Sequence, residues 1–393
     1  MTFWYIPLFA ALVGWGTNWL AIQLTFYPVQ RVGLTRWIGW QGVIPRKSRK
    51  MAAISVDRTL ARFGDMESVF LKLQPELITR QILKQVLPRL EEYIDEVMIE
   101  HHAVLWDNLP LAMRQRIYKW AEAQLPKRIE ALVADFGDEL VDLVDLQELF
   151  VDELDKHPEL MVKIFQQSGE KELKFIVKSG FGFGLIIGLL MVLAVKTAPV
   201  AWLLPVGGFV VGFITNWLAL NLIFRPLNPR YFLGFCIQGL FLKRQEEVSK
   251  VWSRLIAEEL ITVEKVSRSM VFGKNGHRTR AIIQRHIRPI LDQSVLLKVV
   301  TQVAVGAGGY AELKKALQDK AVAVSTEPFH DMSFNKDRAP VVAEVIEARM
   351  TSLSAAEFQD VLRPAFQEEE WQLMLIGGGL GALVGVIQWF LLV

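Results

Sequence analysis

This sequence contains four long apolar stretches. Long segments of mixed polar and apolar residues follow the first and the third of them. The four stretches cover residues 3–27, 181–203, 205–224 and 371–393. Each is long enough to cross the roughly 30 Å hydrocarbon core of a bilayer as a helix, and Lys196 is the only full charge among them. A cleaved signal peptide is the alternative for the first stretch, but no basic residue precedes it and its motif recurs inside the chain. We therefore predict four membrane-spanning helices.

The segments between the spans carry apolar residues at helical spacing. Three stripes recur every three or four positions, as expected for one face of a helix: Ile78, Ile82, Val86, Leu90 and Ile94; Leu125, Ile129, Leu132, Phe136 and Leu140; and Ile283, Ile287, Ile290 and Leu291. The pattern predicts long amphipathic helices rather than a compact α/β enzyme domain. Such stripes are typical of a packed core or of contact with a partner helix, and a groove that shields lipid is the alternative.

The sequence contains an internal duplication. Residues 17–28 align without gaps on residues 215–226 and are identical at eight of twelve positions. Further matches follow at nearly the same offset, pairing Gln41 and Gly42 with Gln238 and Gly239, and Gly184 and Gly188 with Gly381 and Gly385. Each copy holds two spans, so both copies have the same orientation, as in parallel transporter repeats. We predict an all-α integral membrane protein of two tandem parallel repeats, each running span, cytosolic amphipathic helices, span.

The expected boundaries follow from these patterns. Transmembrane helices are expected over 1–30, 180–203, 204–225 and 371–393, interfacial or re-entrant segments over 31–50 and 226–245, and cytosolic helical segments over 51–179 and 246–370.

Charge sets the expected orientation. Residues 31–50 hold six basic residues and no acid, whereas residues 51–179 hold 24 acidic and 16 basic residues. Basic residues accumulate at the cytosolic ends of spans. Because basic runs follow the first and third spans, we expect both termini outside and the large segments in the cytosol. The composition, 52% hydrophobic and 22% charged, suits a membrane protein with sizeable soluble parts, and the single cysteine excludes a disulfide framework or a multi-cysteine metal cluster.

Three elements carry a family resemblance: residues 17–21 with Phe26 and Pro28, the stretch 39–46 (Gly-Trp-Gln-Gly-Val-Ile-Pro-Arg), and the glycine-rich spans. Together they resemble the bacterial YheB/YjiN-like membrane proteins, a family of unknown function, over essentially the whole chain. The resemblance implies a protein of the bacterial cytoplasmic (inner) membrane and implies no reaction. The second copy departs from the pattern, since residues 235–241 lack the Trp and the Pro, so any function of this element is expected in the first copy.

Polar residues inside the spans form the first candidate site. Asparagine amides within lipid need partners, so they either bond across packed helices or line a polar site where the repeats meet. The residues concerned are Thr17, Asn18, Trp19, Gln23, Thr215, Asn216, Trp217 and Asn221.

The short apolar segments after spans one and three form a second candidate set. They suit a membrane-surface anchor or a re-entrant element on a lipid or solute path. The expected interfacial or lipid-contacting residues are Arg36, Trp37, Trp40, Gln41, Gly42, Pro45, Arg46, Gln238 and Gly239. The pairs Gly184–Gly188 and Gly381–Gly385 have GxxxG spacing, which predicts close helix packing within one chain or between chains. The glycines at 306–309 are expected to form a loop.

No GxSxG, HExxH, Walker or kinase signature occurs, so we expect no enzymatic activity, no cofactor and no bound metal. The first hypothesis is a homo-oligomeric, membrane-anchored helical scaffold with an envelope-organising role. The alternative is an oligomeric channel or conduit for lipid or small solute. Expected partners are membrane lipids and further copies of the chain, and no nucleic acid.

Overall fold

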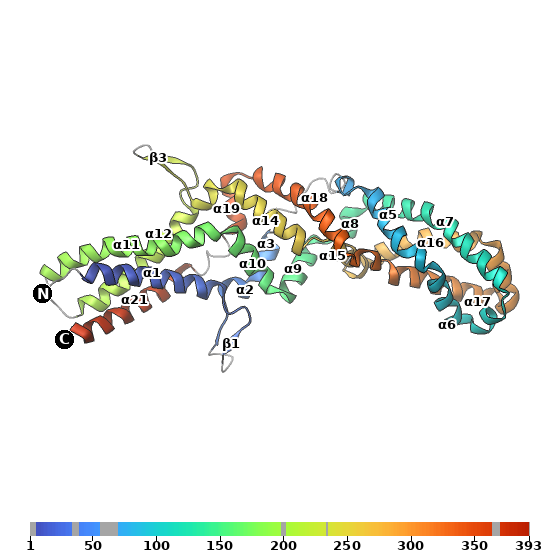
Figure 1. Ribbon diagram of the computed structural model, residues 1–393, viewed down its shortest axis with the longest axis horizontal. Helices are drawn as coiled ribbons and strands as arrows, with labels where there is room; N and C mark the ends of the chain where they lie inside the picture. Colours follow the sequence, from blue (N-terminus) through green and yellow to red (C-terminus); the bar gives the residue numbers. More distant parts are fainter. Residues whose placement is uncertain are drawn as a thin grey trace. The chain divides into compact units, whose positions relative to one another are not determined.

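A computed structural model describes residues 5–33, 39–55, 70–197, 202–232, 235–363 and 370–392 of the protein, and Figure 1 shows its elements. In chain order they are α1 (Tyr5–Phe26), β1 (Val32–Gly33), β2 (Gly39–Trp40), α2 (Val43–Arg46), α3 (Ser48–Ser55), α5 (Pro75–Val86), η2 (Leu87–Arg89), α6 (Leu90–Asn108), α7 (Leu111–Asp138), α8 (Leu140–Leu143), α9 (Leu146–Lys156), α10 (Pro158–Ser168), α11 (Glu170–Thr197), α12 (Leu203–Phe224), β3 (Arg230–Phe232), β4 (Phe235–Ile237), α13 (Leu240–Lys243), α14 (Gln245–Glu259), α15 (Val263–Phe272), α16 (Gly276–Gln293), α17 (Val295–Val324), η3 (Glu327–His330), α18 (Met332–Thr351), α19 (Ala355–Leu362) and α21 (Glu370–Leu392).

The chain divides into two compact units. Unit 1 comprises residues 1–62, 150–253 and 346–393, and unit 2 comprises residues 63–149 and 254–345. Each unit therefore draws on both halves of the sequence.

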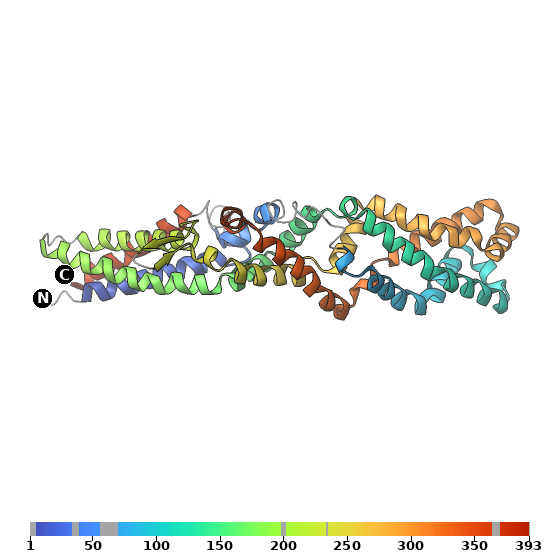
Figure 2. The ribbon, with the colours of Figure 1, turned by 90° about the horizontal axis from the view of Figure 1, so that it is seen from above.

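Unit 1 contains a bundle of four apolar helices. Helix α1 packs on α11 and α12 packs on α21, and all four run side by side in both views (Figures 1 and 2). Ala10 and Val13 of α1 meet Val211 of α12 in the centre of the bundle. Helix α1 begins and α21 ends at the same end of the bundle (Figure 1), as expected for two consecutive helical hairpins.

These four helices are long and apolar enough to cross a membrane. Large apolar side chains such as Leu12, Ile186 and Phe390 are exposed on their outer faces, where lipid would cover them. The structure therefore agrees with the expectation of an all-α membrane protein. The bent pair α16 and α17 passes the same length and composition test, as a broken span or a re-entrant loop. However, α16 carries four arginines (Arg278, Arg280, Arg285 and Arg288), whose transfer into hydrocarbon is costly.

The helix that contains the second apolar stretch begins well before that stretch. Helix α11 begins at Glu170 rather than at residue 180 or 181, and Leu203 belongs to α12. No proline interrupts residues 170–197, so the polar residues ahead of the apolar stretch continue the same helix.

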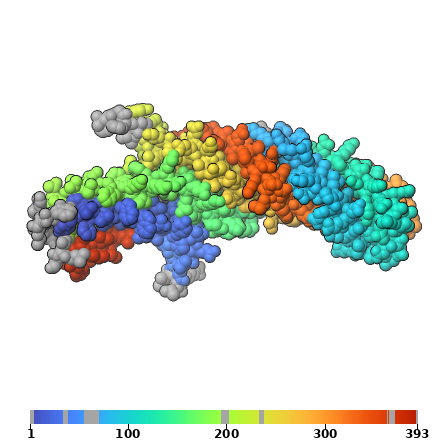
Figure 3. Space-filling model, in the orientation of Figure 1, coloured from blue at the N-terminus to red at the C-terminus, as the bar shows by residue number. Residues whose placement is uncertain are grey.

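Each of α1 and α12 is followed by a short antiparallel strand pair. Val32 pairs with Trp40 in the first, and Arg230 pairs with Ile237 in the second. The first ribbon, which contains β1, stands out from the neighbouring helices of unit 1 in the space-filling view (Figure 3). Strand pairing was not expected from the sequence in either segment.

Unit 2 is built from amphipathic helices. Its larger core gathers buried residues of α5, α7, α15 and α16, among them Ile82, Leu132 and Ile283, and a second core joins α6, α7 and α17. The expected loop at residues 306–309 is wrong, because these residues lie within α17. The backbone breaks from helical geometry at Gly306, whose φ of 76° favours glycine.

Candidate functional site

The apolar stripes of the sequence converge in unit 2. Pro75 begins α5 at a position where a proline needs no intrahelical partner, and Ile78 and Ile82 follow on its buried face. Helices α7 and α16 present Leu132 and Ile283 towards the same interior. The stripes thus come from distant parts of the chain and meet within one unit.

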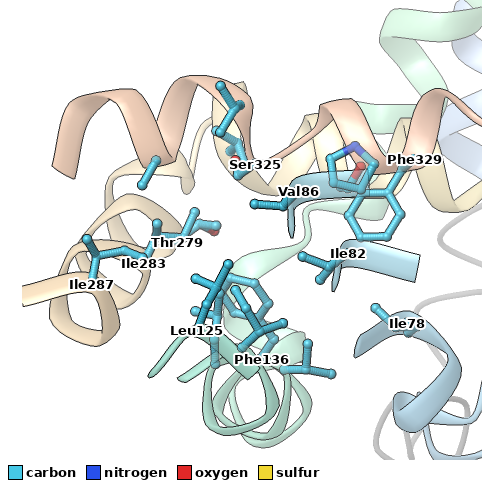
Figure 4. Close-up of a pocket in the computed structure, with 18 of the residues that line it drawn as sticks. Ile78, Ile82, Val86, Leu125, Phe136, Thr279, Ile283, Ile287, Ser325 and Phe329 are labelled. Carbon is cyan, nitrogen blue, oxygen red and sulfur yellow. The ribbon is translucent and has the colours of Figure 1, made fainter. Parts of the chain in front are cut away.

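The stripes line a partly open cavity of about 280 Å³. All the residues of the three predicted stripes line it, and Figure 4 shows Val86 and Ile82 of α5 opposite Ile283 and Thr279 of α16. Leu125 and Phe136 of α7 lie on a further side, where Figure 4 also labels them. The lining is almost entirely hydrocarbon, so the cavity suits an apolar occupant.

A few polar side chains also line the cavity, and most of them have partners. The Ser267 hydroxyl donates to the Glu264 carbonyl at 2.8 Å, and that of Ser325 donates to the Val322 carbonyl at 2.7 Å. The ammonium of Lys320 is paired with Glu96.

Thr279 differs from these residues. Its side chain is 0% exposed, and its hydroxyl has no hydrogen-bond partner among the residues that the structure describes. A buried polar atom left in this way costs about 1–3 kcal/mol. Among the described residues that line the cavity, Thr279 is thus the one whose hydroxyl has no hydrogen-bond partner.

Ion pairs and hydrogen bonds hold the helices around the cavity. Asp135 of α7 accepts hydrogen bonds from His286 at 2.8 Å and Arg285 at 2.6 Å, both on α16. The His286 hydrogen bond, opposed by burial and assisted by Arg285, lowers the pKa of Asp135. These contacts fix the α7–α16 seam, across which Trp120 also donates to the Ile290 carbonyl at 3.1 Å.

A second polar contact joins α5 to η3 and the start of α18. Gln81 of α5 donates to the Pro328 carbonyl at 2.9 Å and lies 3.3 Å from the Asp331 carboxylate. Asp331 also accepts hydrogen bonds from the Ser333 hydroxyl and from the Phe334 amide at the start of α18. The Ser333 hydroxyl, followed by that backbone amide, lowers the pKa of Asp331 to about 2.

The predicted polar residues of the spans do not gather at one site. Asn18 donates to the Ile176 carbonyl of α11 at 2.7 Å, and Asn216 donates to the Leu373 carbonyl of α21 at 2.9 Å. Each amide thus bonds to a neighbouring helix: Asn18 of α1 to α11, and Asn216 of α12 to α21. The other six residues do not bond across helices in the same way. Thr17, Thr215 and Asn221 donate to carbonyls of their own helices. Trp19 and Trp217 are about half exposed, and Gln23 is half-buried.

The Gln-Gly pairs make the same contacts in both halves. Gln41 and Gln238 donate to the carbonyls of Val29 and Leu227 at 2.9 and 3.1 Å. The glycines that follow them, Gly42 and Gly239, lie so close to the ends of α1 and α12 that an added Cβ would be 2.7 Å from a backbone carbon in each case. Both motifs therefore bring the chain back against the end of the preceding helix.

The other residues expected to contact lipid in these segments differ in burial and in hydrogen bonding. Trp40 donates to the Leu24 carbonyl at 3.3 Å, Pro45 is buried in α2, and Arg46 is exposed. Arg36 and Trp37 lie outside the described residues.

The paired glycines of the spans lie inside contacts of a single chain. A Cβ at Gly188 would be 2.6 Å from the Cα of Pro7 on α1, and one at Gly385 would be 2.7 Å from the Cα of Pro205 on α12. Gly184 and Gly381 likewise face the backbones of α1 and α12. These glycines therefore allow close approach within the protomer.

One buried carboxylate lies beside the bundle. Glu172, 2% exposed in the first turn of α11, forms an ion pair with Arg244, which also contacts Glu247 at 2.7 Å. The hydrogen bond from Arg244, reinforced by one from Lys171, lowers the pKa of Glu247 to about 2. Sequence reasoning assigned no contact to Glu172.

Sequence reasoning also missed Thr279, although a signal was present. Thr279 lies four residues before Ile283, which lies four before Ile287, so it occupies a stripe position. A single polar residue on an otherwise apolar stripe marks a hydrogen-bonding point in the interior.

The fold defines a helical membrane protein with a cavity-containing helical unit. The chain is similar to UPF0754 membrane proteins of Staphylococcus epidermidis (28% identical over 96 residues, 24% of this chain and 26% of the relative) and Staphylococcus aureus (26% over 97 residues, 24% and 26%). It thus spans about a quarter of the length of the curated relatives that it matches. No family model matches, and no solved structure matches significantly. The similarity supports a bacterial membrane protein, and these names state no activity.

Proposed function

We propose that this protein is a non-enzymatic, lipid-handling membrane protein that holds an acyl chain in the cavity of unit 2. The observation that carries the proposal is the apolar lining of a cavity of about 280 Å³. Removing apolar surface from water stabilises by about 25 cal/mol per Å², so an apolar occupant of this hydrocarbon-lined cavity would stabilise unit 2.

The volume favours one chain rather than a larger ligand. An engineered apolar cavity of about 150 Å³ accommodates benzene, and the cavity here is about 280 Å³. A single hydrocarbon chain suits this space, whereas an amphipathic helix about 10 Å wide does not. The four apolar helices of unit 1 are long enough to insert the protein into a bilayer, which contains such ligands.

Photo-crosslinking tests this proposal. The full-length protein in mild detergent would be incubated with a fatty alcohol that carries a photoactivatable group on its chain, and cross-linked peptides would be mapped by mass spectrometry. We expect labels on residues that line the cavity. Ile283→Phe should reduce labelling by filling the cavity, whereas Ala281→Phe, which adds the same ring on the exposed face of α16, should not. Labelling confined to the spans, or unchanged by Ile283→Phe, contradicts the proposal.

We also propose the repeat arrangement and its orientation. The eight identical residues of the duplicated motif support it, as do the matching asparagine and Gln-Gly contacts of the two halves. Both copies would insert in the same direction into the bacterial cytoplasmic membrane, with both termini outside and the soluble helices in the cytosol. Reporter fusions near residues 120 and 300 should report the same, cytosolic side. Opposite sides would refute the arrangement.

A homo-oligomeric scaffold with an envelope-organising role is the second candidate. Exposed apolar side chains on α6 and α17, which pack on each other, favour it, because such surfaces in soluble regions mark contact sites. Val104 is 79% exposed and Val303 is 83% exposed. Native mass spectrometry in mild detergent should detect oligomers that Val104→Ser with Val303→Ser weakens. A monomer at all concentrations would remove this candidate.

A further inference from the structure

The cavity combines an almost continuous hydrocarbon wall with one uncommitted hydroxyl group. Thr279 is 0% exposed, lines the cavity and lacks a hydrogen-bond partner among the described residues. Figure 4 shows its side chain among those that face the cavity, beside Ile283. A role for this hydroxyl group in ligand binding rests on the proposed function and narrows the class of ligand.

The other polar groups of the lining do not share this property. The Ser294 hydroxyl accepts a hydrogen bond from the Leu297 amide at 3.4 Å, and the hydroxyls of Ser267 and Ser325 donate to carbonyls of their own segments. Lys320 is engaged by Glu96 and lies near the Tyr93 ring, 5.4 Å from its centroid. Among the described lining residues, Thr279 is therefore the one whose hydroxyl has no hydrogen-bond partner at all.

We propose that the ligand of this cavity is a single-chain lipid that carries a neutral oxygen group, such as a hydroxyl or an ester carbonyl, and that Thr279 bonds to this oxygen. A buried donor left without a partner is costly, and a ligand oxygen removes that cost. A plain hydrocarbon cannot do so. An ionised carboxylate would need more than one hydrogen bond to offset its desolvation in such an apolar site. A neutral oxygen provides a hydrogen-bond partner for Thr279 without the desolvation cost of a charge.

Fluorescence quenching can test this assignment, because Trp120 lines the cavity. Two probes of equal chain length would be compared on the full-length protein in mild detergent: a bromoalkane, and the bromoalcohol that carries a hydroxyl at the other end. Trp120→Phe identifies the part of the quenching that comes from the cavity. Thr279→Val removes the hydroxyl at nearly constant shape, and Thr279→Ser retains it.

We expect the wild-type protein to bind the alcohol more tightly than the alkane. Thr279→Val should weaken alcohol binding about 2- to 12-fold, the range for one net hydrogen bond, and should leave alkane binding unchanged or stronger. Thr279→Ser should retain the preference for the alcohol.

Three results would contradict the inference. If both probes bind equally to the wild type, or if Thr279→Val leaves alcohol binding unchanged, the role of Thr279 is refuted while acyl-chain binding stands. If neither probe produces Trp120-dependent quenching, the proposed function fails as well. Unchanged thermal unfolding of the Val variant separates loss of the bond from loss of the fold.

Discussion

Replacement of Gly180 by alanine should separate helices α1 and α11 and destabilise the bundle of unit 1. A Cβ at this position would lie 2.6 Å from the side-chain nitrogen of Asn18 and 2.8 Å from the carbonyl carbon of Gly14. It would overlap the Gly14 carbonyl oxygen more closely still. Ordinary van der Waals contacts lie at 3.4–4 Å, so the helices must move apart by roughly 1 Å, enough to lose about half of the well depth of each atomic contact. The same movement stretches the hydrogen bond between Asn18 and Ile176.

The magnitude can be isolated with a matched control. Gly182 lies two residues further along the same helix, and a Cβ there meets nothing within 4 Å. Both alanine variants gain the same intrinsic helix preference, about 0.5–1 kcal/mol, so this gain cancels in their difference. Overpacking costs about 1–3 kcal/mol. Gly180→Ala should therefore be less stable than Gly182→Ala by about that amount.

The assay is thermal unfolding of the full-length protein in mild detergent, followed by fluorescence-detected size exclusion. Gly377→Ala and Gly379→Ala provide an independent repetition on α21, because Gly377 faces Asn216 and Gly379 meets nothing within 4 Å. Equal stability of Gly180→Ala and Gly182→Ala would refute the close approach of α1 and α11.

Three further substitutions probe other contacts. Asn18→Leu removes the hydrogen bond to α11 and should cost about 0.6–1.7 kcal/mol in detergent unfolding, and a wild-type-like melting curve would argue against that bond. Arg244→Met leaves the buried Glu172 charge unpaired and should cost about 3–5 kcal/mol, and adding Glu172→Gln should restore much of the loss; no recovery in the double variant would disprove the pairing. The pKa of Asp331 is lowered to about 2 in the folded protein, against about 3.9 when unfolded, so its stabilising contribution is present above pH 4 and is lost as the pH falls towards 2. Asp331→Asn should therefore flatten the decline of melting temperature between pH 4 and pH 2, and an unaltered decline would exclude this carboxylate as a contributor.

The pattern of apolar residues along the sequence was sufficient to predict that the four spans are helices. A run of about 20 apolar residues crosses a bilayer only as a helix, because lipid offers no partner for backbone amides and carbonyls. The stripes of the soluble segments were equally readable, since helical spacing fixes which side chains share a face. The spacing of Ile78, Ile82 and Ile283 alone assigns each of them to such a face.

The tertiary structure decided what those faces meet. A stripe specifies that a face is buried but not whether its partners fill the space completely, because close packing depends on the side chains of helices distant in the sequence. The spacing therefore left a packed core and a lipid-shielding groove open, and did not show that residues 78–94 and 279–291 line one cavity. For the same reason, the sequence indicated that Asn18 needed a partner but not that this partner is a backbone carbonyl of α11, which lies near it only because Gly14 and Gly180 let the two helices approach.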